Sequence, residues 1–357
     1  MNSFYLPIIV EKDSNYYSTL CESLDCYLQV IESNKIEIDI RNDIYTICQE
    51  IKETIRLYYS SQINSAYLKV KRIIEFVTNR IPNCICSIQD IFGENKETFF
   101  YKARIGEPSE NYKQEDLLHI PFNLRGRVPN TRFSINGCPC IYLGTTSLIT
   151  WLELGKPVYN NFYVSCFRIT GKIQVLNFIK EDWDKLSGEL NNGKIINDNR
   201  EELLLFPLIL ATSFIVKEKD RVFKSEYIIS QLIMQIMASQ NRGVVYFSKR
   251  TFLQNAVSVC VAIPAIPCEE SMINSLGIVR ERANLIDING VMENTVPCNY
   301  SDFLALPISA RNYETSCGDI IYGAQCSLAN RGLPYSWTDF YQFDRYLIDQ
   351  LKKKSCK

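Results

Sequence analysis

The chain has 357 residues, of which 46% are hydrophobic and 12% aromatic, enough apolar side chains for one large packed domain or two ordinary ones. The 39 Lys and Arg residues nearly balance the 40 Asp and Glu residues, and the net charge of −1 excludes a global field that would attract nucleic acid or an anionic membrane. The sequence begins without the basic and apolar segments of a secretion signal, so we expect a cytoplasmic protein that does not bind membranes.

Apolar residues at helical spacing characterise the first part of the chain. Residues 44–58, behind a polar cap at residues 42–43, and residues 63–77 form amphipathic patterns, and a weaker one runs through residues 20–31. We therefore expect residues 1–95 to form an all-α region. No part of it gathers the polar groups of a reactive site, so regulation or partner binding is its expected role.

Turn-forming residues 92–96 separate this region from a segment in which strand patterns alternate with helices. The expected strands span residues 99–104, 139–143, 163–169, 172–178, 244–247 and 256–263. The third and fourth of these strands flank Gly171 and are expected to pair as a hairpin. Strands mixed with helices in this order predict an α+β fold.

Helix-capping residues place helices between these strands. Thr145 or Thr146 can cap a helix that runs through Glu153 and ends at Gly155. Further helices are expected over residues 203–216, 225–240 and 340–351. The first of these is strongly apolar but falls short of the roughly 20 residues that span a bilayer, so we interpret it as a buried helix.

These patterns divide the chain into a helical region over residues 1–95, a catalytic domain over residues 96–270 and a C-terminal segment over residues 271–357. Prolines and glycines break the last segment into short pieces, and no motif stands out in it. We expect it to pack on the catalytic domain.

The residue types present disfavour several kinds of chemistry. The 14 cysteines are scattered through a long chain without an export signal, so we expect free thiols. The Cys-x-Cys pairs beginning at residues 84 and 138 lack zinc-site spacing, and His119 is the single histidine, so no metal site is expected. His119 lies in an apolar, strand-like run that favours a structural imidazole. No Rossmann fingerprint or P-loop occurs.

Several blocks of the sequence resemble the RES family. Residues 100–104 resemble its opening strand, and residues 132–144 resemble its core of arginine-phenylalanine, glycine-proline and tyrosine-leucine pairs. Glu153 stands where the family has its glutamate, and Ser248 follows a glycine and a strand, as the family's serine does. Residues 226–231 resemble the helix before that serine, with a serine where relatives have proline. The resemblance covers less than half of the chain.

This resemblance implies a fold and an activity. Members of the RES family are toxins of bacterial toxin–antitoxin modules that cleave the nicotinamide–ribose bond of NAD, with water or phosphate as the acceptor. Their fold resembles that of ADP-ribosyltransferases, which implies a mixed or antiparallel β core with helices here. The implied function is NAD depletion by a toxin or antiphage defence effector, with NAD as the substrate, no metal, and an antitoxin or regulatory protein as a partner.

The matched residues suit this reaction. A carboxylate at Glu153 can stabilise the oxocarbenium character that develops when an N-glycosidic bond breaks. Arg104 and Arg132 are the candidates to bind the pyrophosphate, because the guanidinium group contacts phosphate through two parallel hydrogen bonds. Tyr142 can stack on the nicotinamide ring and Ser248 can hydrogen-bond the ribose or nicotinamide. Arg132, Tyr142 and Ser248 would thus serve both catalysis and NAD binding.

Each of these residues also has a purely structural interpretation. Glutamates at helix ends are usually solvated, and arginines usually pair with surface carboxylates. Tyr142 alternates with apolar neighbours as a core residue does, and a serine on a strand usually has no catalytic role. Arg125 and Arg127 flank Gly126 in a basic loop that can bind phosphate or simply be exposed.

Other functions stay open at this stage. A mono-ADP-ribosyltransferase would use the same residues but deliver ADP-ribose to a protein or nucleic acid. A non-catalytic RES-like module would act by binding alone. The helices of residues 1–95 suit docking of an antitoxin, a second copy of the chain or a phage-sensing partner, or serve as a lid or packing support. The sequence does not decide the acceptor, the trigger or the oligomeric state.

Overall fold

The computed structural model describes residues 4–10, 15–93, 97–108, 110–179, 183–196, 200–216, 218, 221–250, 258–265, 292–311, 325–328 and 331–355. The chain forms two compact units. The helical unit comprises Met1–Ile85, Pro129–Asn136 and Leu176–Gln240, and the sheet unit comprises Cys86–Val128, Gly137–Val175 and Asn241–Lys357.

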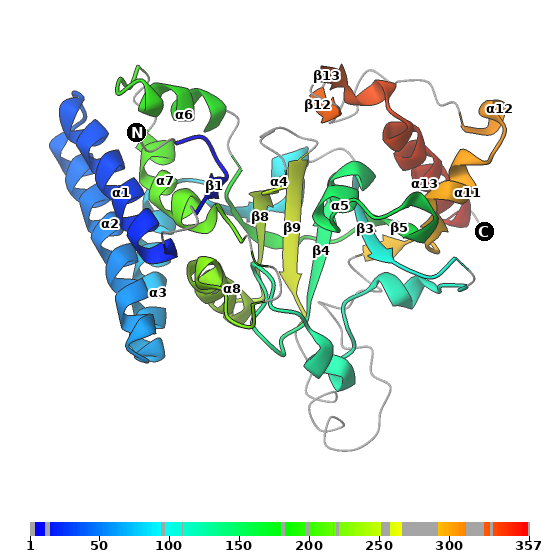
Figure 1. The fold of residues 1–357 in the computed structure, drawn as a ribbon, viewed down its shortest axis with the longest axis horizontal. Coiled ribbons are helices and arrows are strands. Elements are labelled where there is room, and N and C mark those ends of the chain that lie inside the picture. The colour runs from blue at the N-terminus through cyan, green and yellow to red at the C-terminus, as the bar shows by residue number, and fades with distance from the viewer. Residues whose placement is uncertain are drawn as a thin grey trace. The chain divides into compact units, whose positions relative to one another are not determined.

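The helical unit is built from amphipathic helices packed around the buried helix α7 (Arg200–Thr212). Its helices are α1 (Tyr16–Ser33), α2 (Ile38–Tyr59), α3 (Ile63–Arg80), α6 (Trp183–Asn191), α7 and α8 (Ile228–Ser239), with a 3₁₀ turn, Ser225–Tyr227, before α8. Helix α2 packs against α1, α3, α7 and α8 (Figure 1). Its buried residues recur at helical spacing through Ile44, Ile47 and Ile51, as the sequence predicts.

Helix α7 is buried along most of its length and contains Pro207. A proline has no N–H, so the carbonyl of Leu203, four residues earlier, loses its helical donor. The buried hydroxyl of Tyr27 on α1 donates to that carbonyl at 2.7 Å instead. Tyr16 likewise donates to the Ala211 carbonyl at 3.0 Å. These hydrogen bonds join α1 to α7 and satisfy groups that would otherwise be buried without partners.

The start of α2 differs from the sequence prediction. The expected cap at Asn42 and Asp43 lies inside the helix, which begins at Ile38 after an N-cap at Glu37. The reason is that Ile40 is buried, so the apolar face continues for one turn before the predicted cap. Asp43 forms an ion pair with Arg80 of α3 at 2.8 Å.

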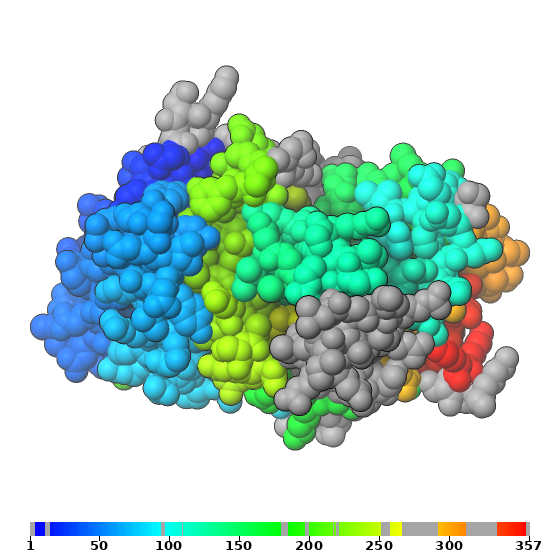
Figure 2. All heavy atoms as spheres, turned by 90° about the horizontal axis from the view of Figure 1, so that it is seen from below, coloured from blue at the N-terminus to red at the C-terminus, as the bar shows by residue number. Residues whose placement is uncertain are grey.

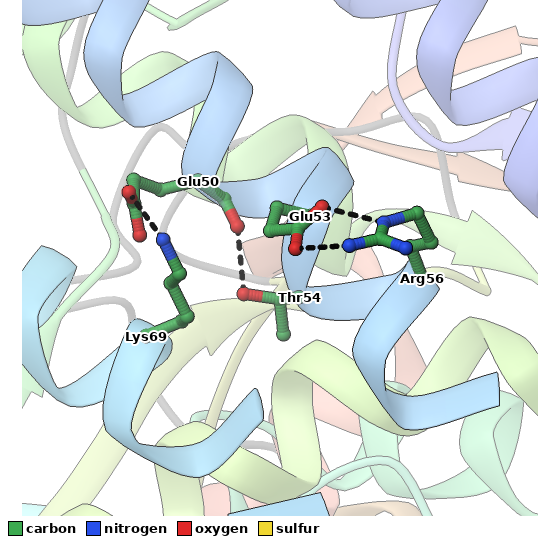
Figure 3. Close-up of polar contacts among 5 residues, drawn as sticks. All are labelled: Glu50, Glu53, Thr54, Arg56 and Lys69. Atoms are coloured by element: carbon green, nitrogen blue, oxygen red, sulfur yellow. Dashed lines mark hydrogen bonds and ion pairs between the residues drawn. The ribbon is translucent and has the colours of Figure 1, made fainter. Parts of the chain in front are cut away.

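Charged residues cover the outer faces of α2 and α3. Figure 3 shows Lys69 of α3 paired with Glu50 of α2 at 2.7 Å, and Arg56 in a two-pronged contact with Glu53 of its own helix. Thr54 donates to the Glu50 carbonyl at 2.7 Å. In the space-filling view, atoms of α3 lie beside those of α8, which belongs to the same unit (Figure 2). Ion pairs that keep contact with solvent, as these do, contribute little stability individually.

The main β-sheet has the strand order β10-β5-β3-β4-β9-β8-β6-β2, and β11 also pairs with β5. The strands are β2 (Ile85–Ser87), β3 (Thr98–Ile105), β4 (Cys140–Gly144), β5 (Phe162–Ile169), β6 (Gln174–Asn177), β8 (Gly243–Phe247), β9 (Val259–Pro264), β10 (Met292–Asn294) and β11 (Cys298–Asn299). The β3–β5, β3–β4, β4–β9 and β8–β9 pairs are antiparallel.

The predicted strands 99–104, 139–143 and 244–247 are confirmed. For the strand predicted over residues 256–263, residues 256–257 lie outside the described residues.

The expected hairpin around Gly171 is wrong. Strand β5 pairs with β3 on one edge and with β10 and β11 on the other, so neither edge is left for β6. Strand β6 lies between β8 and β2 instead. The glycine at position 171 predicts a turn between the two strands but not their partners. The partners of β5 come from segments that are distant in the sequence.

The C-terminal segment contributes helices to the aromatic core of the sheet unit. These are α11 (Tyr300–Leu304), α12 (Ile308–Arg311) and α13 (Asp339–Ser355), with a 3₁₀ turn at Tyr335–Trp337. Tyr300 stacks on Phe340 with ring centroids 4.8 Å apart, beside Phe303 and Phe343. The apolar spacing within residues 340–351 therefore correctly predicted a core helix.

Smaller elements complete the described structure. They are strands β1 (Ile8–Ile9), β7 (Phe214–Ile215), β12 (Gln325–Leu328) and β13 (Arg331–Pro334), helices α4 (Ile88–Phe92) and α5 (Ser147–Glu153), and 3₁₀ turns at Gln114–Leu117, Phe122–Arg127 and Tyr159–Asn161. Strand β1 pairs with β7 in parallel. Among the described helices, none combines the length and apolar character needed to cross a bilayer.

The compact units interleave along the chain, whereas the sequence analysis divided it into consecutive segments at residues 95 and 270. The physical reason is that α7 and α8, from the middle of the chain, bury their apolar faces against α2 and α3. The expected boundaries fall at or beside residues 94–96 and 271–291, which lie outside the described residues. The fold combines a helical N-terminal region with a mixed sheet, which agrees with the predicted α+β class. Residues 1–95 are not all-α as expected, because β1 and β2 lie within them and pair with strands from later in the chain.

Candidate active site

The register of three neighbouring strands brings distant parts of the sequence to one end of the sheet. Gly144, the last residue of β4, is opposite Cys260 of β9, which is opposite Tyr246 of β8. Because β4 and β8 both run antiparallel to β9, they end on the same side. The residues that follow β4 and β8 therefore emerge close together.

Helix α5 follows β4 and carries Glu153 as its last residue. Thr146 is the N-cap, and its side chain accepts a hydrogen bond from the Ile149 amide at 3.1 Å, as the sequence predicts. The chain leaves the helix at Gly155, which has a φ of +84°. Gly144 lies so close to the Ile149 side chain that any Cβ there would overlap it, so β4 and α5 approach each other tightly. Glu153 is thus held at the end of a short, firmly anchored helix.

Ser248 follows the end of β8 and meets Glu153. Its hydroxyl donates a hydrogen bond to Oε1 of the Glu153 carboxylate. Its backbone amide donates to the Ser258 carbonyl at 2.8 Å, which continues the β8–β9 ladder by one residue. The serine is buried, whereas the glutamate side chain is 39% exposed. Glu153 and Ser248, which resemble RES-family residues in separate blocks of the sequence, are therefore in direct contact in the structure.

Arg250 is a third member of this cluster, which the sequence analysis missed. Its Nε lies 3.8 Å from Oε2 of Glu153, and its backbone amide donates to Ser248 Oγ at 3.1 Å. The contact places positive charge beside one carboxylate oxygen while the serine hydroxyl contacts the other. The only signal in the sequence was the position of Arg250 two residues after a matched serine, which is too common a pattern to select it.

Arg104 lies near the end of β3 and does not contact Glu153. Its guanidinium lies 4.3 Å over the ring of Tyr112, and Nη1 donates to the Asp116 carbonyl at 3.4 Å. Lys102, two residues earlier on the same face of β3, donates to the Leu118 carbonyl at 2.7 Å. In the described parts of the chain, neither cation forms an ion pair with a carboxylate.

Desolvation lowers the pKa of Lys102 to about 8, and the charge of Arg104 adds to this effect. A lysine in this setting is close to losing its proton near neutral pH. Two neighbouring cations without a carboxylate counterion form a local positive site in a chain whose net charge is −1. The sequence analysis identified Arg104 but not Lys102.

Tyr142 lies in the middle of β4, opposite Ala262 of β9, and is half-buried. The β3–β4 ladder contains a single residue pair, Tyr101 with Gly144. The ladder ends at this pair. The residues of β3 that follow it, up to Arg104, and the residues of β4 that precede Gly144, including Tyr142, are not paired with each other. The strands that carry Arg104 and Tyr142 therefore separate on the side where those two residues lie.

Arg132 belongs to the helical unit, whereas Glu153, Ser248, Arg104 and Tyr142 belong to the sheet unit. Its guanidinium lies 5.0 Å over the ring of Phe133. Gln231 of α8 holds this segment, because its amide nitrogen donates to Asn130 Oδ1 and to the carbonyls of Thr131 and Ser134 at 2.6, 3.2 and 3.0 Å. The two sequence blocks that contain Arg132 and Gln231 therefore meet in the structure.

The residues to which the sequence analysis gave no role lie apart from this cluster. His119 is buried, with Nδ1 2.8 Å from the Ile120 carbonyl, but the predicted strand around it is wrong: the run falls between two 3₁₀ turns. Arg125 and Arg127 are exposed. Within the described residues the cysteines are free thiols, and no three His, Cys, Asp or Glu side chains are grouped to bind a metal ion.

The chain is similar to a curated protein of Bacillus subtilis (strain 168) named "Putative toxin YopC". The two are 29% identical over 222 residues, which cover 58% of this chain and 49% of that protein. The match thus spans about half the length of the relative. No protein-family model matches the chain, and no solved structure matches it. The similarity is to a protein named as a toxin.

Proposed function

We propose that this chain is an NAD-consuming toxin that cleaves the nicotinamide–ribose bond, as a glycohydrolase or phosphorylase of the RES type with an ADP-ribosyltransferase-like fold. The observation that carries the proposal is the hydrogen bond from Ser248 to Glu153. Two residues matched to the RES pattern from sequence blocks far apart are in direct contact. The similarity to YopC supports the toxin part of the proposal.

The cluster suits the chemistry of N-glycosidic bond cleavage. As nicotinamide leaves, positive charge develops on the ribose ring, and a carboxylate on one face stabilises it. Ser248 fixes one oxygen of Glu153, which limits the rotation of the carboxylate and keeps the other oxygen near Arg250. Glu153 is the catalytic candidate, and its exposed carboxylate leaves room for a ribose.

The neighbouring cations suit the pyrophosphate of NAD. Arg104 offers a planar group for two parallel hydrogen bonds, and Lys102 adds a second charge from the same strand face. The pairing of Tyr101 with Gly144 puts Tyr142 on the face of the sheet that carries Tyr101, whereas Lys102 and Arg104 lie on the other face. The stacking of nicotinamide on Tyr142 is therefore proposed from the sequence resemblance alone. Arg132 belongs to the helical unit, and its role as a phosphate ligand rests on the sequence resemblance alone.

A toxin of this kind requires control, and we propose an antitoxin or other regulatory protein as the partner of the helical unit. The amphipathic helices α1–α3 extend well beyond what the NAD reaction needs. Because they share a core with α7 and α8, deleting them would remove the packing of those helices. Partner binding is therefore tested with surface substitutions rather than with a truncation at residue 96.

The experiment that tests the proposed function follows the fate of both halves of NAD. Purified wild-type protein is incubated with NAD, with and without inorganic phosphate, beside Glu153→Ala. We expect the wild type alone to release nicotinamide, with free ADP-ribose in water or its phosphorylated form when phosphate is the acceptor. ADP-ribose bound to protein or nucleic acid would identify a mono-ADP-ribosyltransferase instead. Folded wild-type protein that consumes no NAD would contradict the proposal.

A further inference from the structure

A buried carboxylate of the C-terminal helix contacts the start of the helix that carries Glu153. Asp344 of α13 is 1% exposed. Its Oδ1 accepts a hydrogen bond from the Ser147 amide at 3.0 Å, and its Oδ2 accepts one from the Tyr335 hydroxyl at 2.7 Å. Ser147 is the first residue of α5. An amide at this position has no carbonyl partner within its own helix, so Asp344 supplies the missing acceptor.

Further contacts strengthen this link. The Ser147 hydroxyl donates to the Phe340 carbonyl at 3.4 Å, and the Tyr101 hydroxyl donates to the Asp344 carbonyl at 3.3 Å. Trp151, on the next turn of α5, packs against Phe340 with ring centroids 5.5 Å apart. One helix of the C-terminal segment thus holds both the backbone and a large side chain of α5.

The geometry points to Asp344 as a positioning residue for Glu153. We propose that its ionised carboxylate fixes the first turn of α5 and thereby the direction from which Glu153 meets Ser248. Helix α5 is only 7 residues long, so a shift at its first residue is transmitted to its last. The inference rests on the proposed function for its catalytic consequence, but the positioning itself does not depend on NAD chemistry.

The site around Asp344 favours a change of charge near neutral pH. Burial raises the pKa of Asp344 to about 7, although the donors on Ser147 and Tyr335 oppose this rise. The charge of Asp344 also helps to raise the pKa of Tyr101 of β3, Cys166 of β5 and Tyr300 of α11, while Arg345 of α13 acts in the opposite direction on Tyr101. Protonation would remove an acceptor site from the cluster and weaken the contact with α5.

Fluorescence of Trp151 tests the positioning directly. The chain contains three tryptophans; replacing Trp183 and Trp337 by Phe leaves Trp151 as the reporter on α5. We expect its emission to titrate with a midpoint near pH 7, and Asp344→Asn to abolish that transition. Tyr335→Phe should move the midpoint to higher pH, because it removes a donor that stabilises the carboxylate. The same transition in wild type and Asp344→Asn would overturn the inference.

Kinetics test the consequence for the reaction. We expect the kcat for NAD cleavage to fall as pH decreases through about 7 in the wild type, and Asp344→Asn to stay at the low value at all pH values with little change in KM. A loss of about tenfold at high pH is expected for a small displacement of the carboxylate. If kcat falls with decreasing pH in Asp344→Asn as it does in the wild type, the effect of Asp344 on the reaction is overturned. If the wild type does not cleave NAD but the Trp151 transition depends on Asp344, the proposed function fails and the positioning stands.

Discussion

The side-chain ion pairs of α2 and α3 differ in kind from the polar contacts around α5 in the sheet unit. On α2 and α3 they are ion pairs between partly exposed side chains, such as Glu50 with Lys69, which are 28% and 26% exposed (Figure 3). In the sheet unit, the contacts of Glu153 with Ser248 and of Asp344 with Ser147 join residues far apart in the sequence, and each includes a buried partner. Buried polar groups cost free energy unless they are hydrogen-bonded, and the contacts around α5 satisfy this requirement.

The largest expected effect is on turnover. Glu153→Gln should lower kcat for NAD cleavage by about 1000-fold, and Ser248→Ala by about tenfold to 100-fold. Because the serine acts through the glutamate, the double variant should be no slower than Glu153→Gln alone. Steady-state kinetics with nicotinamide detection measure this, with Glu107→Gln, an exposed glutamate of the same unit, as the control. Additive losses would show that the two residues do not work as a unit.

The next effect concerns stability and pH. The folded protein holds the proton of Asp344 up to about pH 7, whereas an unfolded Asp releases it near 3.8. The free energy of unfolding should therefore fall as pH rises from about 4 to about 7, by an amount on the order of 4 kcal/mol, and level off above. Asp344→Asn should lack this contribution. Urea unfolding at several pH values measures it, and parallel curves for the two proteins would contradict the assignment.

A smaller effect is expected for substrate binding at the cations of β3. Lys102 is charged below its pKa of about 8 and neutral above, so the KM for NAD should rise as pH increases through that value. Lys102→Met should raise KM about tenfold at neutral pH and remove this dependence. It should not destabilise the fold, because the buried charge is itself unfavourable. Lys172→Met, at an exposed position, is the matched control, and an unchanged KM in Lys102→Met would exclude the lysine from the site.

The smallest effect is expected on the helical unit. Lys69→Met and Glu50→Gln should each change the free energy of unfolding by about 1 kcal/mol or less and leave NAD cleavage unchanged, because both side chains keep contact with solvent. Chemical denaturation and the NAD assay together check this. A large loss of activity in either variant would mean that the helical unit takes part in the reaction.

Local signals in the sequence predicted most of the elements that form the site. The cap at Thr146, the glycine after Glu153 and the apolar runs of β3, β4 and β8 all act within a few residues, and each was placed correctly. Strand pairing was not predictable in the same way, because the partners of β5 come from distant segments.

The residues added by the structure share a physical property. Arg250 and Asp344 lie outside every matched block and Lys102 lies in one without an assigned role, and all three gain a role only through contacts across the fold. Asp344 lies in the segment where the sequence analysis found no motif at all. Arg132 differs from these residues, because the sequence motif identifies it but the structure places it in the helical unit, on a loop held by Gln231.

The central claim is that Glu153 and Ser248 form an NAD-cleaving site. Its most direct test is a single-turnover measurement of nicotinamide release from NAD by wild-type and Glu153→Gln protein, with circular dichroism showing that both are folded. We expect one nicotinamide to be released for each NAD lost in the wild type, and a rate lower by about 1000-fold in the variant. Equal release by both proteins, or none by the wild type, would contradict it.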